Sequence, residues 1–322
     1  MIPNSPYTML PLWLSLISLL GILTIFKHTI SLLKWTYITF IRPPKNLKKT
    51  YGSWALITGS SDGIGRAFAF QLATHGLDLI LVSRTTTKLD RVAHDIKHKF
   101  PNTNIKVVTI DFTKDVTYVI GEIERVIKGL DVGVLVNNVG ITYPKAMYFH
   151  ELNEEMLLNI LRVNMGAISG VTKAVLPSML RKKKGAIVNI GSGASVVVPS
   201  HPLYAIYAAT KAYTDQLSRC LHVEYKNVGI DVQCQVPLYV ATKMALNVAS
   251  VKRPTLFIPT AEDYAVAAVR RIGYEARCTP FWAHSLQWCL ASFVPNSWLD
   301  AWRLSIGVQR IEIGYFIILP FL

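Results

Sequence analysis

The stretch TGSSDGIG (residues 58–65) decides the fold that we predict for this chain. It follows an apolar run, WALIT at residues 54–58, and opens a segment of helix-forming residues. A strand, a glycine-rich turn and a helix in this order present backbone N–H groups and the positive end of a helix dipole to a pyrophosphate. In such a turn Gly59 permits the tight bend, Gly63 the close approach of the backbone, and Gly65 the packing of helix on strand.

Apolar runs of strand length alternate with helix-length segments beyond this turn. Parallel strands buried on both faces are continuously apolar, so these runs predict strands at residues 54–58, 79–83, 105–110, 132–137, 186–190 and 230–236. Their alternation predicts an α/β protein with a Rossmann-like, doubly wound parallel sheet in a single domain. A later helix, at residues 260–273, is expected to begin with a capping box between Thr260 and Asp263.

The N-terminal segment predicts a transmembrane helix. No charged residue occurs at positions 2–26, and residues 9–26 are long enough to cross the hydrocarbon core as a helix. A cleaved signal peptide would have a basic start and small residues at its end, and neither occurs here. Basic residues follow up to Lys49, with no acidic residue before Asp62, so the positive-inside rule places the rest of the chain on the cytoplasmic side.

The charge balance narrows the classes of partner. The chain has 34 Lys and Arg against 20 Asp and Glu, a formal charge of +14. This excess suits an anionic membrane face or a substrate that bears phosphates. Nucleic acid ranks last because neither zinc-finger spacing nor an arginine-rich arm occurs. The four cysteines lack C-x-x-C spacing, so no disulfide framework or metal site is expected, which is typical of a reducing compartment.

The end of the second predicted strand indicates which dinucleotide the turn would bind. An acidic residue there would bind the ribose hydroxyls of NAD. This chain instead has Ser83, Arg84 and, further on, Lys88. A basic, hydroxyl-bearing strand end suits a 2′-phosphate, so we predict NADP(H) as the cofactor. The alternative is an exposed arginine on a loop of a basic protein.

Five motifs in order resemble the short-chain dehydrogenase/reductase family: TGSSDGIG at residue 58, NNVG at 137, VNMGA at 163, GAIVNIGS at 185 and YAATK at 207. The resemblance covers residues 54–244. It departs from the usual pattern at Val139, where alanine is common, and at Leu238, where glycine is common. The cofactor site that it implies comprises Gly59, Ser60, Ser61, Gly63, Ile64, Gly65, Ser83, Arg84, Lys88, Asp111 at the adenine, Asn138, Gly140, Tyr207, Lys211, and Val240 and Thr242 at the nicotinamide amide.

A tyrosine four residues before a lysine occurs in two similar copies, YAATK at residue 207 and YVATK at residue 239, and about one such pair is expected by chance. The first copy runs into a helical segment, so Lys211 would lie one turn above Tyr207, lower its pKa and let it act as a general acid. The second copy follows Pro237 in a predicted loop, where Tyr239 and Lys243 need not face one another. We therefore predict Tyr207 as the catalytic tyrosine.

The resemblance also implies a serine and an asparagine in the catalytic group. The serine polarises the substrate carbonyl, and both Ser192 and Ser195 follow the fifth predicted strand. The usual spacing of thirteen residues before the tyrosine falls on Ala194, and a two-residue insertion restores Ser192, which we prefer. Asn164 would hold a water that links Lys211 to solvent as a proton relay; the alternative is an ordinary asparagine on the surface of a long helix.

The remaining segments bear on the substrate. An anchor, a basic face and the apolar residues 244–259 suggest a long lipid-like substrate, with Lys252 and Arg253 either meeting the phosphates of coenzyme A or exposed as ordinary surface charges. We divide the chain into an anchor (residues 1–28), an interfacial segment and basic linker (29–50), a catalytic domain (51–280) and an apolar C-terminal extension (281–322). That extension either contacts the membrane surface or packs in the core.

Longer stretches, such as GAIVNIGSGAS, look like the membrane-bound very-long-chain 3-oxoacyl-CoA reductases. That resemblance implies NADPH-dependent reduction of a 3-oxoacyl-CoA in fatty-acid elongation, at the endoplasmic reticulum membrane with the catalytic domain in the cytosol. It implies membrane lipid and the other elongase subunits as partners. The lysine-rich C-terminal tail of that family is absent here. Two alternatives remain: a reductase of steroids or other lipid ketones, and a catalytically weak scaffold within the elongase.

Overall fold

The computed structural model describes residues 11–249, 251 and 253–318, and the chain divides into two compact units, before and after the Pro43–Pro44 bond. In the first unit, helix α1 (Leu12–Thr36) runs directly into a π-helical turn, η1 (Tyr37–Ile41). Together they are long and apolar enough to cross a membrane. The helix does not end at residue 28, where the sequence suggested a change to an interfacial segment. Residues 9 and 10, the start of the predicted span, lie outside the described residues.

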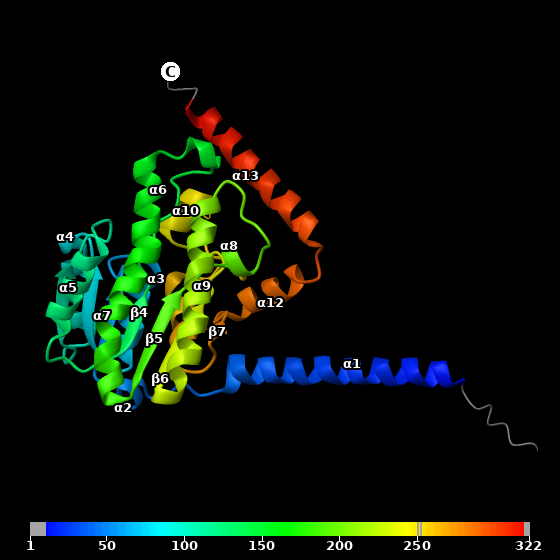
Figure 1. The fold of residues 1–322 in the computed structure, drawn as a ribbon, viewed down its shortest axis with the longest axis horizontal. Coiled ribbons are helices and arrows are strands. Elements are labelled where there is room, and N and C mark those ends of the chain that lie inside the picture. Colours follow the sequence, from blue (N-terminus) through cyan, green and yellow to red (C-terminus); the bar gives the residue numbers. More distant parts are fainter. Residues whose placement is uncertain (1–10, 250, 252, 319–322) are drawn as a thin grey trace, which may run out of the picture. The chain divides into compact units, whose positions relative to one another are not determined.

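The second unit is built on a seven-stranded, fully parallel sheet of order β3-β2-β1-β4-β5-β6-β7. The chain winds outward from β1 to β3, returns beside β1 with β4, and winds outward again on the other side through β5, β6 and β7. Figure 1 labels the strands of this second half. Six strands lie within one residue of their predicted bounds at either end; the short β7 was not predicted. The strands are β1 (Trp54–Thr58), β2 (Asp78–Ser83), β3 (Ile105–Thr109), β4 (Val132–Asn137), β5 (Gly185–Ile190), β6 (Ile230–Gln235) and β7 (Arg277–Cys278).

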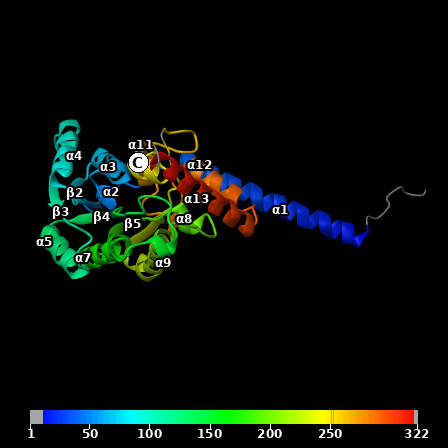
Figure 2. The same ribbon diagram turned by 90° about the horizontal axis from the view of Figure 1, so that it is seen from above.

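Helices cover both faces of the sheet, with α2, α3, α4 and α11 on one side and α5, α7 and α9 on the other (Figure 2). Each layer buries its own apolar cluster, as a doubly wound fold requires. The helices are α2 (Leu47–Tyr51), α3 (Gly63–Thr74), α4 (Thr86–Lys99), α5 (Val116–Ile127), α6 (Glu154–Leu161), α7 (Ala167–Lys182), α8 (Gly193–Val196), α9 (Ala205–Tyr225), α10 (Lys243–Ala249), α11 (Ala261–Val269), α12 (Trp282–Ala291) and α13 (Asn296–Ile318). Shorter turns are η2 (Phe149–Glu151), η3 (Arg162–Gly166) and η4 (Lys226–Val228).

Helix α11 begins where predicted but is capped differently. Thr260 Oγ1 accepts the backbone N–H of Asp263 at 3.0 Å, as in a capping box. In a complete capping box the Asp263 carboxylate would accept the backbone N–H of Thr260. Here the carboxylate instead accepts the hydroxyl of Thr260 at 2.7 Å.

The C-terminal helices pack on the second unit. Leu203 and Tyr204 belong to a small buried cluster against which Val308 and Ile311 of α13 pack. A Cβ at Gly307 would lie 2.6 Å from Leu203 Cδ1, so glycine lets the helix approach closely. The other side of these helices remains exposed, including Phe293 at 76 % and Trp298 at 70 %. One side of this extension therefore packs in the core, and contact of its exposed side with the membrane surface stays a prediction.

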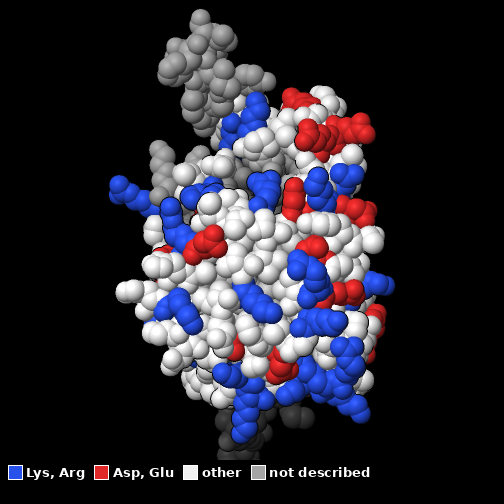
Figure 3. Space-filling model, turned by 90° about the vertical axis from the view of Figure 1, so that its left-hand side faces the viewer, with Lys and Arg blue, Asp and Glu red and all other residues white. Residues whose placement is uncertain are grey.

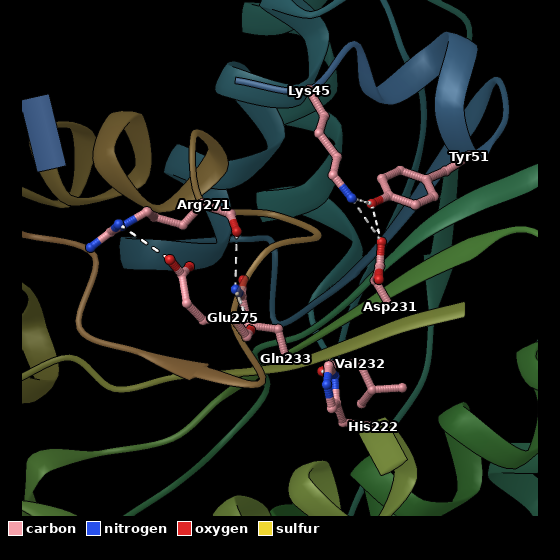
Figure 4. A network of polar contacts seen from close by, with 8 residues as sticks. All are labelled: Lys45, Tyr51, His222, Asp231, Val232, Gln233, Arg271 and Glu275. Carbon is pink, nitrogen blue, oxygen red and sulfur yellow. Dashed lines mark hydrogen bonds and ion pairs between the residues drawn. The ribbon is translucent and has the colours of Figure 1, made fainter. Parts of the chain in front are cut away.

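A polar network holds the start of the second unit against the first residues of β6, at the amino ends of the strands (Figure 4). Lys45 Nζ lies 3.0 Å from both Tyr51 Oη and Asp231 Oδ2, and the Tyr51 hydroxyl donates to Asp231 Oδ2 at 2.5 Å. Burial, and then the contact with Asp231, raise the pKa of Tyr51 far above its ordinary value, so it remains a neutral donor. The linker is thus attached on the side remote from the carboxyl ends of the strands.

Basic side chains are dispersed rather than gathered on the side of the unit that carries α4 and α5. Figure 3 shows Lys and Arg spread over this face with Asp and Glu between them. The excess of positive charge therefore forms no continuous basic surface here.

Candidate active site

A cavity of about 1020 Å³ opens at the carboxyl ends of the strands. It lies where the strand order reverses between β1 and β4, the usual ligand position in doubly wound sheets. Loops that follow each of the strands β1 to β6 line it, and α12 and α13 contribute its apolar far wall.

The glycine-rich turn has the backbone shape that its sequence predicted. Gly59 and Gly63 have φ angles of +66° and +54°, in the region that favours glycine. A Cβ at Gly65 would lie 2.3 Å from Gly59 O and 2.4 Å from Asn138 Nδ2, so the helix packs on the turn without room for a side chain. Asp62 caps α3 by accepting the Gly63 N–H at 2.8 Å.

Most of the predicted cofactor residues line this part of the cavity: Gly59, Ser61, Gly63, Ile64, Ser83, Arg84, Asp111, Asn138, Gly140, Val240 and Thr242. Ser60 does not, because its side chain is fully buried and its hydroxyl donates to Val82 O at 3.4 Å. Gly65 lies beneath the turn, and Lys88 is exposed on α4 away from the lining.

The end of β2 carries a compact polar group. The hydroxyls of Ser61 and Ser83 lie 2.9 Å apart. Asp111 Oδ1 accepts the N–H and the hydroxyl of Thr113 at 3.0 and 2.9 Å. These bonds and the positive charge of Arg84 lower the pKa of Asp111, so the pocket mouth combines an ionised carboxylate with an exposed guanidinium.

Tyr207 and Lys211 lie one turn apart on α9, as the helical spacing predicted. Lys211 is 7 % exposed, its Nζ donates to Ile190 O at 2.8 Å, and it lies 5.9 Å from the Tyr207 ring centroid. Burial lowers the pKa of Lys211 to about 8, so it is still largely protonated at neutral pH.

The expected lowering of the Tyr207 pKa does not occur in this structure. Burial raises the pKa of the phenol above its ordinary value, and a hydrogen bond with Ser192 only partly opposes that effect. The ammonium of Lys211 is directed to a backbone carbonyl rather than to the phenol oxygen. Tyr207 is therefore protonated at neutral pH, which is the state that a proton donor needs.

Ser192, and not Ser195, faces Tyr207. Ser192 follows β5, caps the short helix α8 and lines the cavity. The hydroxyl of Ser195 instead donates to the backbone carbonyl of Ser192 at 3.1 Å. Helix α8 and the loop after it accommodate the longer spacing to the tyrosine.

Asn164 lies in the π-helical turn η3 between α6 and α7, rather than on an uninterrupted helix. Its side chain is buried and makes two bonds with the backbone of Ile141, at 2.8 and 2.9 Å, and one with Thr210 Oγ1 at 3.0 Å. It does not line the cavity, but it fixes the loop after β4, where π-turns often mark functional sites.

The second copy of the motif has a different geometry. Tyr239 lies in the loop between β6 and α10, while Lys243 opens α10 and pairs with Asp62 at 2.7 Å. Sequence reasoning missed the residues that act on Tyr239, which are Arg303 and Arg310. Arg303 also lines the cavity, as does His201, with which Arg303 makes a hydrogen bond. The only signal was the seven-residue spacing of Arg303 and Arg310, which places both on one face of a helix.

The sequence profile of the short chain dehydrogenases matches residues 53–252. A very-long-chain 3-oxoacyl-CoA reductase-like protein of Arabidopsis thaliana is 56 % identical over 301 residues, 93 % of this chain and 96 % of that protein. A human protein named inactive hydroxysteroid dehydrogenase-like protein 1 is 39 % identical over 88 % of this chain and 84 % of its own length. Mouse very-long-chain 3-oxoacyl-CoA reductase is 41 % identical over 76 % of each chain.

Solved structures share the fold. A short-chain dehydrogenase from Sphingobium yanoikuyae, solved in complex with NADPH, superposes with a TM-score of 0.62 at 28 % identity, over 74 % of this chain and 92 % of the other. This chain and the solved dehydrogenase therefore share the same parallel-sheet fold.

Proposed function

The chain belongs to the short-chain dehydrogenase family of oxidoreductases, and we propose that it reduces a very-long-chain 3-oxoacyl-CoA to the 3-hydroxyacyl-CoA with NADPH. The observation that carries the proposal is the meeting of Tyr207, Ser192 and Lys211 in a cavity whose far wall is apolar. The 56 % identity to a reductase-like protein of that substrate class supports the choice of substrate.

The residues of the cavity fit a nicotinamide dinucleotide. The turn that ends in Gly65 leaves backbone exposed where a side chain would stand, as a pyrophosphate requires. Ser83 and Arg84 would hold the 2′-phosphate, with Lys88 adding charge from α4, and Asp111 would lie beside the adenine. Asn138, Gly140, Val240 and Thr242 would line the nicotinamide end. When bound, NADPH supplies a hydride to the substrate carbonyl carbon.

The catalytic group then acts on the carbonyl oxygen. Ser192 donates a hydrogen bond to that oxygen and polarises the carbonyl. Tyr207, protonated at neutral pH, transfers its proton to the oxygen as the carbonyl is reduced. Lys211 stabilises the phenolate that results, and Asn164 holds the loop through which a water can return a proton to Lys211.

The substrate chain would lie along the apolar wall formed by α12 and α13. Leu290 and Val294 from the first helix and its end, and Trp298 and Trp302 from the second, line that part of the cavity. These side chains are also partly exposed, so a lipid-like chain could enter the cavity along them. Lys252 lies outside the described residues. Arg253, the next residue along the chain, is exposed, and we propose that it meets the phosphates of coenzyme A.

We further propose the endoplasmic reticulum membrane as the location, with α1 as the anchor and the catalytic unit in the cytosol. The absence of charge at residues 12–26 and the basic residues after them support this orientation. Membrane lipid and the other elongase subunits would be the partners. Residues 51–280 remain our proposed catalytic domain, with 281–322 as an extension whose residues between 287 and 303 contribute to the cavity wall.

A catalytically weak scaffold is the second candidate, because a 39 % identical relative is named inactive. A steroid or other lipid ketone is an alternative substrate for the same residues. Both are separated from our proposal by one assay.

That assay follows NADPH oxidation by the detergent-solubilised full chain with a long-chain 3-oxoacyl-CoA. We expect Tyr207→Phe to lower kcat by roughly 100-fold or more, since positioned proton donors contribute about that much. Ser192→Ala should lower kcat too, whereas its neighbour Ser195→Ala, the matched control, should not. Wild-type protein that reduces only a steroid ketone would replace the substrate class; protein that binds NADPH but oxidises none of it would favour the scaffold.

A further inference from the structure

The loop between β6 and α10 holds Tyr239 beside the cavity. Tyr239 Oη is buried and lies against the guanidinium groups of Arg303 and Arg310, which donate toward it, and no acceptor for its own hydrogen occurs among the residues that the structure describes. His284 fixes the loop, because its Nδ1 accepts the Leu238 N–H at 3.3 Å and its Nε2 donates to Tyr239 O at 3.1 Å. The phenol is therefore held firmly beside the cavity, and its hydroxyl hydrogen is the part that can still be given to an acceptor.

Helix α13 brings two guanidinium groups to the same place. Arg303 is 8 % exposed and lines the cavity, and no acceptor for its Nε occurs within the described part of the chain. The Nη2 atom of Arg303 lies 2.7 Å from Nε2 of His201. Burial and the two arginines hold the pKa of His201 down to about 3, so this ring is neutral and cannot balance the charge.

The position of α13 is fixed. Gly307 packs on Leu203, and the Ser200 hydroxyl bonds to the Asp300 carboxylate one turn before Arg303. Within the described ranges, no ion pair joins Arg303 or Arg310 to a carboxylate. A buried cation without a counter-ion is costly unless an oxygen ligand reaches it.

The two arginines act on Tyr239, and Tyr239 lies near the catalytic tyrosine. Burial alone would raise the pKa of Tyr239, but the guanidinium groups outweigh it and bring the pKa below its ordinary value. Tyr239 in turn contributes to raising the pKa of Tyr207. Tyr239 therefore interacts electrostatically with both the catalytic tyrosine and the arginines, and Tyr207, Tyr239 and Arg303 line the same cavity.

We propose that Tyr239 and Arg303, supported by Arg310, form a second oxygen-binding site that receives the thioester carbonyl of a 3-oxoacyl thioester. This inference rests on the proposed function and specifies how its substrate is recognised. A 3-oxoacyl thioester has two carbonyl oxygens separated by one methylene carbon. Tyr207 and Ser192 bind the 3-oxo oxygen that is reduced, and Tyr239 and Arg303 donate to the thioester oxygen, whose bonds do not change.

Two consequences follow for the reaction. A substrate held at both oxygens cannot rotate about its methylene, so one face of the 3-oxo carbon is presented to the hydride. A ketone without the second oxygen would leave the hydroxyl hydrogen of Tyr239 and the Nε–H of Arg303 without an acceptor, and would be disfavoured for that reason. The site thus selects β-dicarbonyl substrates over simple lipid ketones.

The test compares a long-chain 3-oxoacyl-CoA with the matching 3-oxoalkyl-CoA thioether, in which a methylene replaces the thioester carbonyl. We expect the wild-type full chain to have the higher kcat/KM for the thioester. Tyr239→Phe and Arg303→Met should each lower kcat/KM for the thioester at least about ten-fold and leave that for the thioether almost unchanged. Arg219→Met, an exposed arginine on α9, is the matched control and should change neither.

The outcomes separate the two proposals. Equal losses on thioester and thioether, or no loss on either, would overturn the second oxygen site while leaving the reductase intact. Wild-type protein that reduces neither substrate would overturn the proposed function and this inference with it. The thermal unfolding midpoint and the Kd of NADPH for each variant show whether it is folded, and the conservative Tyr239→Phe retains the ring that packs in the loop.

Discussion

Replacing Gly65 with alanine should disrupt the turn that we expect to bind the pyrophosphate. Two distances indicate how much the free energy of unfolding should change. The new Cβ would lie 2.3 Å from Gly59 O and 2.4 Å from Asn138 Nδ2. The contact to the carbonyl must open to about 3.0 Å or more, and because Gly59 O is a backbone atom the turn itself has to move. Overpacking of this kind costs about 1–3 kcal/mol, and the better helix propensity of alanine offsets about 1 kcal/mol.

Gly121→Ala is the matched control. Gly121 is also a helical glycine, exposed on α5, and a Cβ there meets nothing within 4 Å. The Gly121→Ala substitution gains the same helix-propensity free energy of about 1 kcal/mol, and its new Cβ meets no clash. The two variants should therefore differ in unfolding free energy by about 1–3 kcal/mol, with Gly121→Ala the more stable, which corresponds to about 2–4 °C in Tm for each kcal/mol.

The same variants report on the cofactor. Movement of the turn displaces the N–H groups that face the pyrophosphate, so Gly65→Ala should raise the Kd of NADPH at least about ten-fold. Fluorescence titration with NADPH measures the Kd, and circular dichroism measures Tm. If Gly65→Ala were as stable as Gly121→Ala and bound NADPH with the wild-type Kd, the assignment of this turn would be refuted.

Three further predictions follow from named contacts. Arg84→Asp should lower the preference for NADPH over NADH at least about ten-fold in kcat/KM, because the 2′-phosphate then meets a carboxylate. Burial holds the pKa of His284 at about 4, so the contribution of this residue to stability is present above pH 6.5 and falls by roughly 3 kcal/mol as pH drops from 6.5 to 4. Buried His201, with a pKa of about 3, makes a similar contribution, so His284→Gln should remove about half of the fall measured in denaturant titrations. Tyr51→Phe should lower the unfolding free energy by about 1–3 kcal/mol without changing kcat, since it lies at the remote edge of the sheet.

The sheet was predictable because its strands follow a local rule. Strands buried on both faces must be apolar at successive positions, and β1 and β4 are, residue for residue, where that pattern placed them. Strand β7 was not predicted because its two residues, Arg277 and Cys278, are too few to show an apolar pattern. The glycine turn was equally local, since its φ angles depend on the absence of a Cβ within the turn itself.

The candidate site was predictable only in part, because several of its contacts join distant residues. The pairing of Lys243 with Asp62 and the arrival of Arg303 over the cavity are consequences of folding that no spacing encodes. The pKa of Tyr207 was expected to fall, because its helical neighbour is a cation. Burial of the phenol, which only the packed structure shows, is the larger effect and has the opposite sign.

The two copies of the Tyr-x-x-x-Lys pattern show why such a spacing has meaning only with its secondary structure. In α9 a separation of four residues places Tyr207 and Lys211 on one face, whatever lies around them. In the loop after β6 the same separation fixes no direction, and Lys243 turns to Asp62 while Tyr239 faces α13. A cation still approaches the second tyrosine, but a helix more than sixty residues further along the chain supplies it. The repeated letters thus correspond to two different environments, one set by a helix and one by tertiary packing.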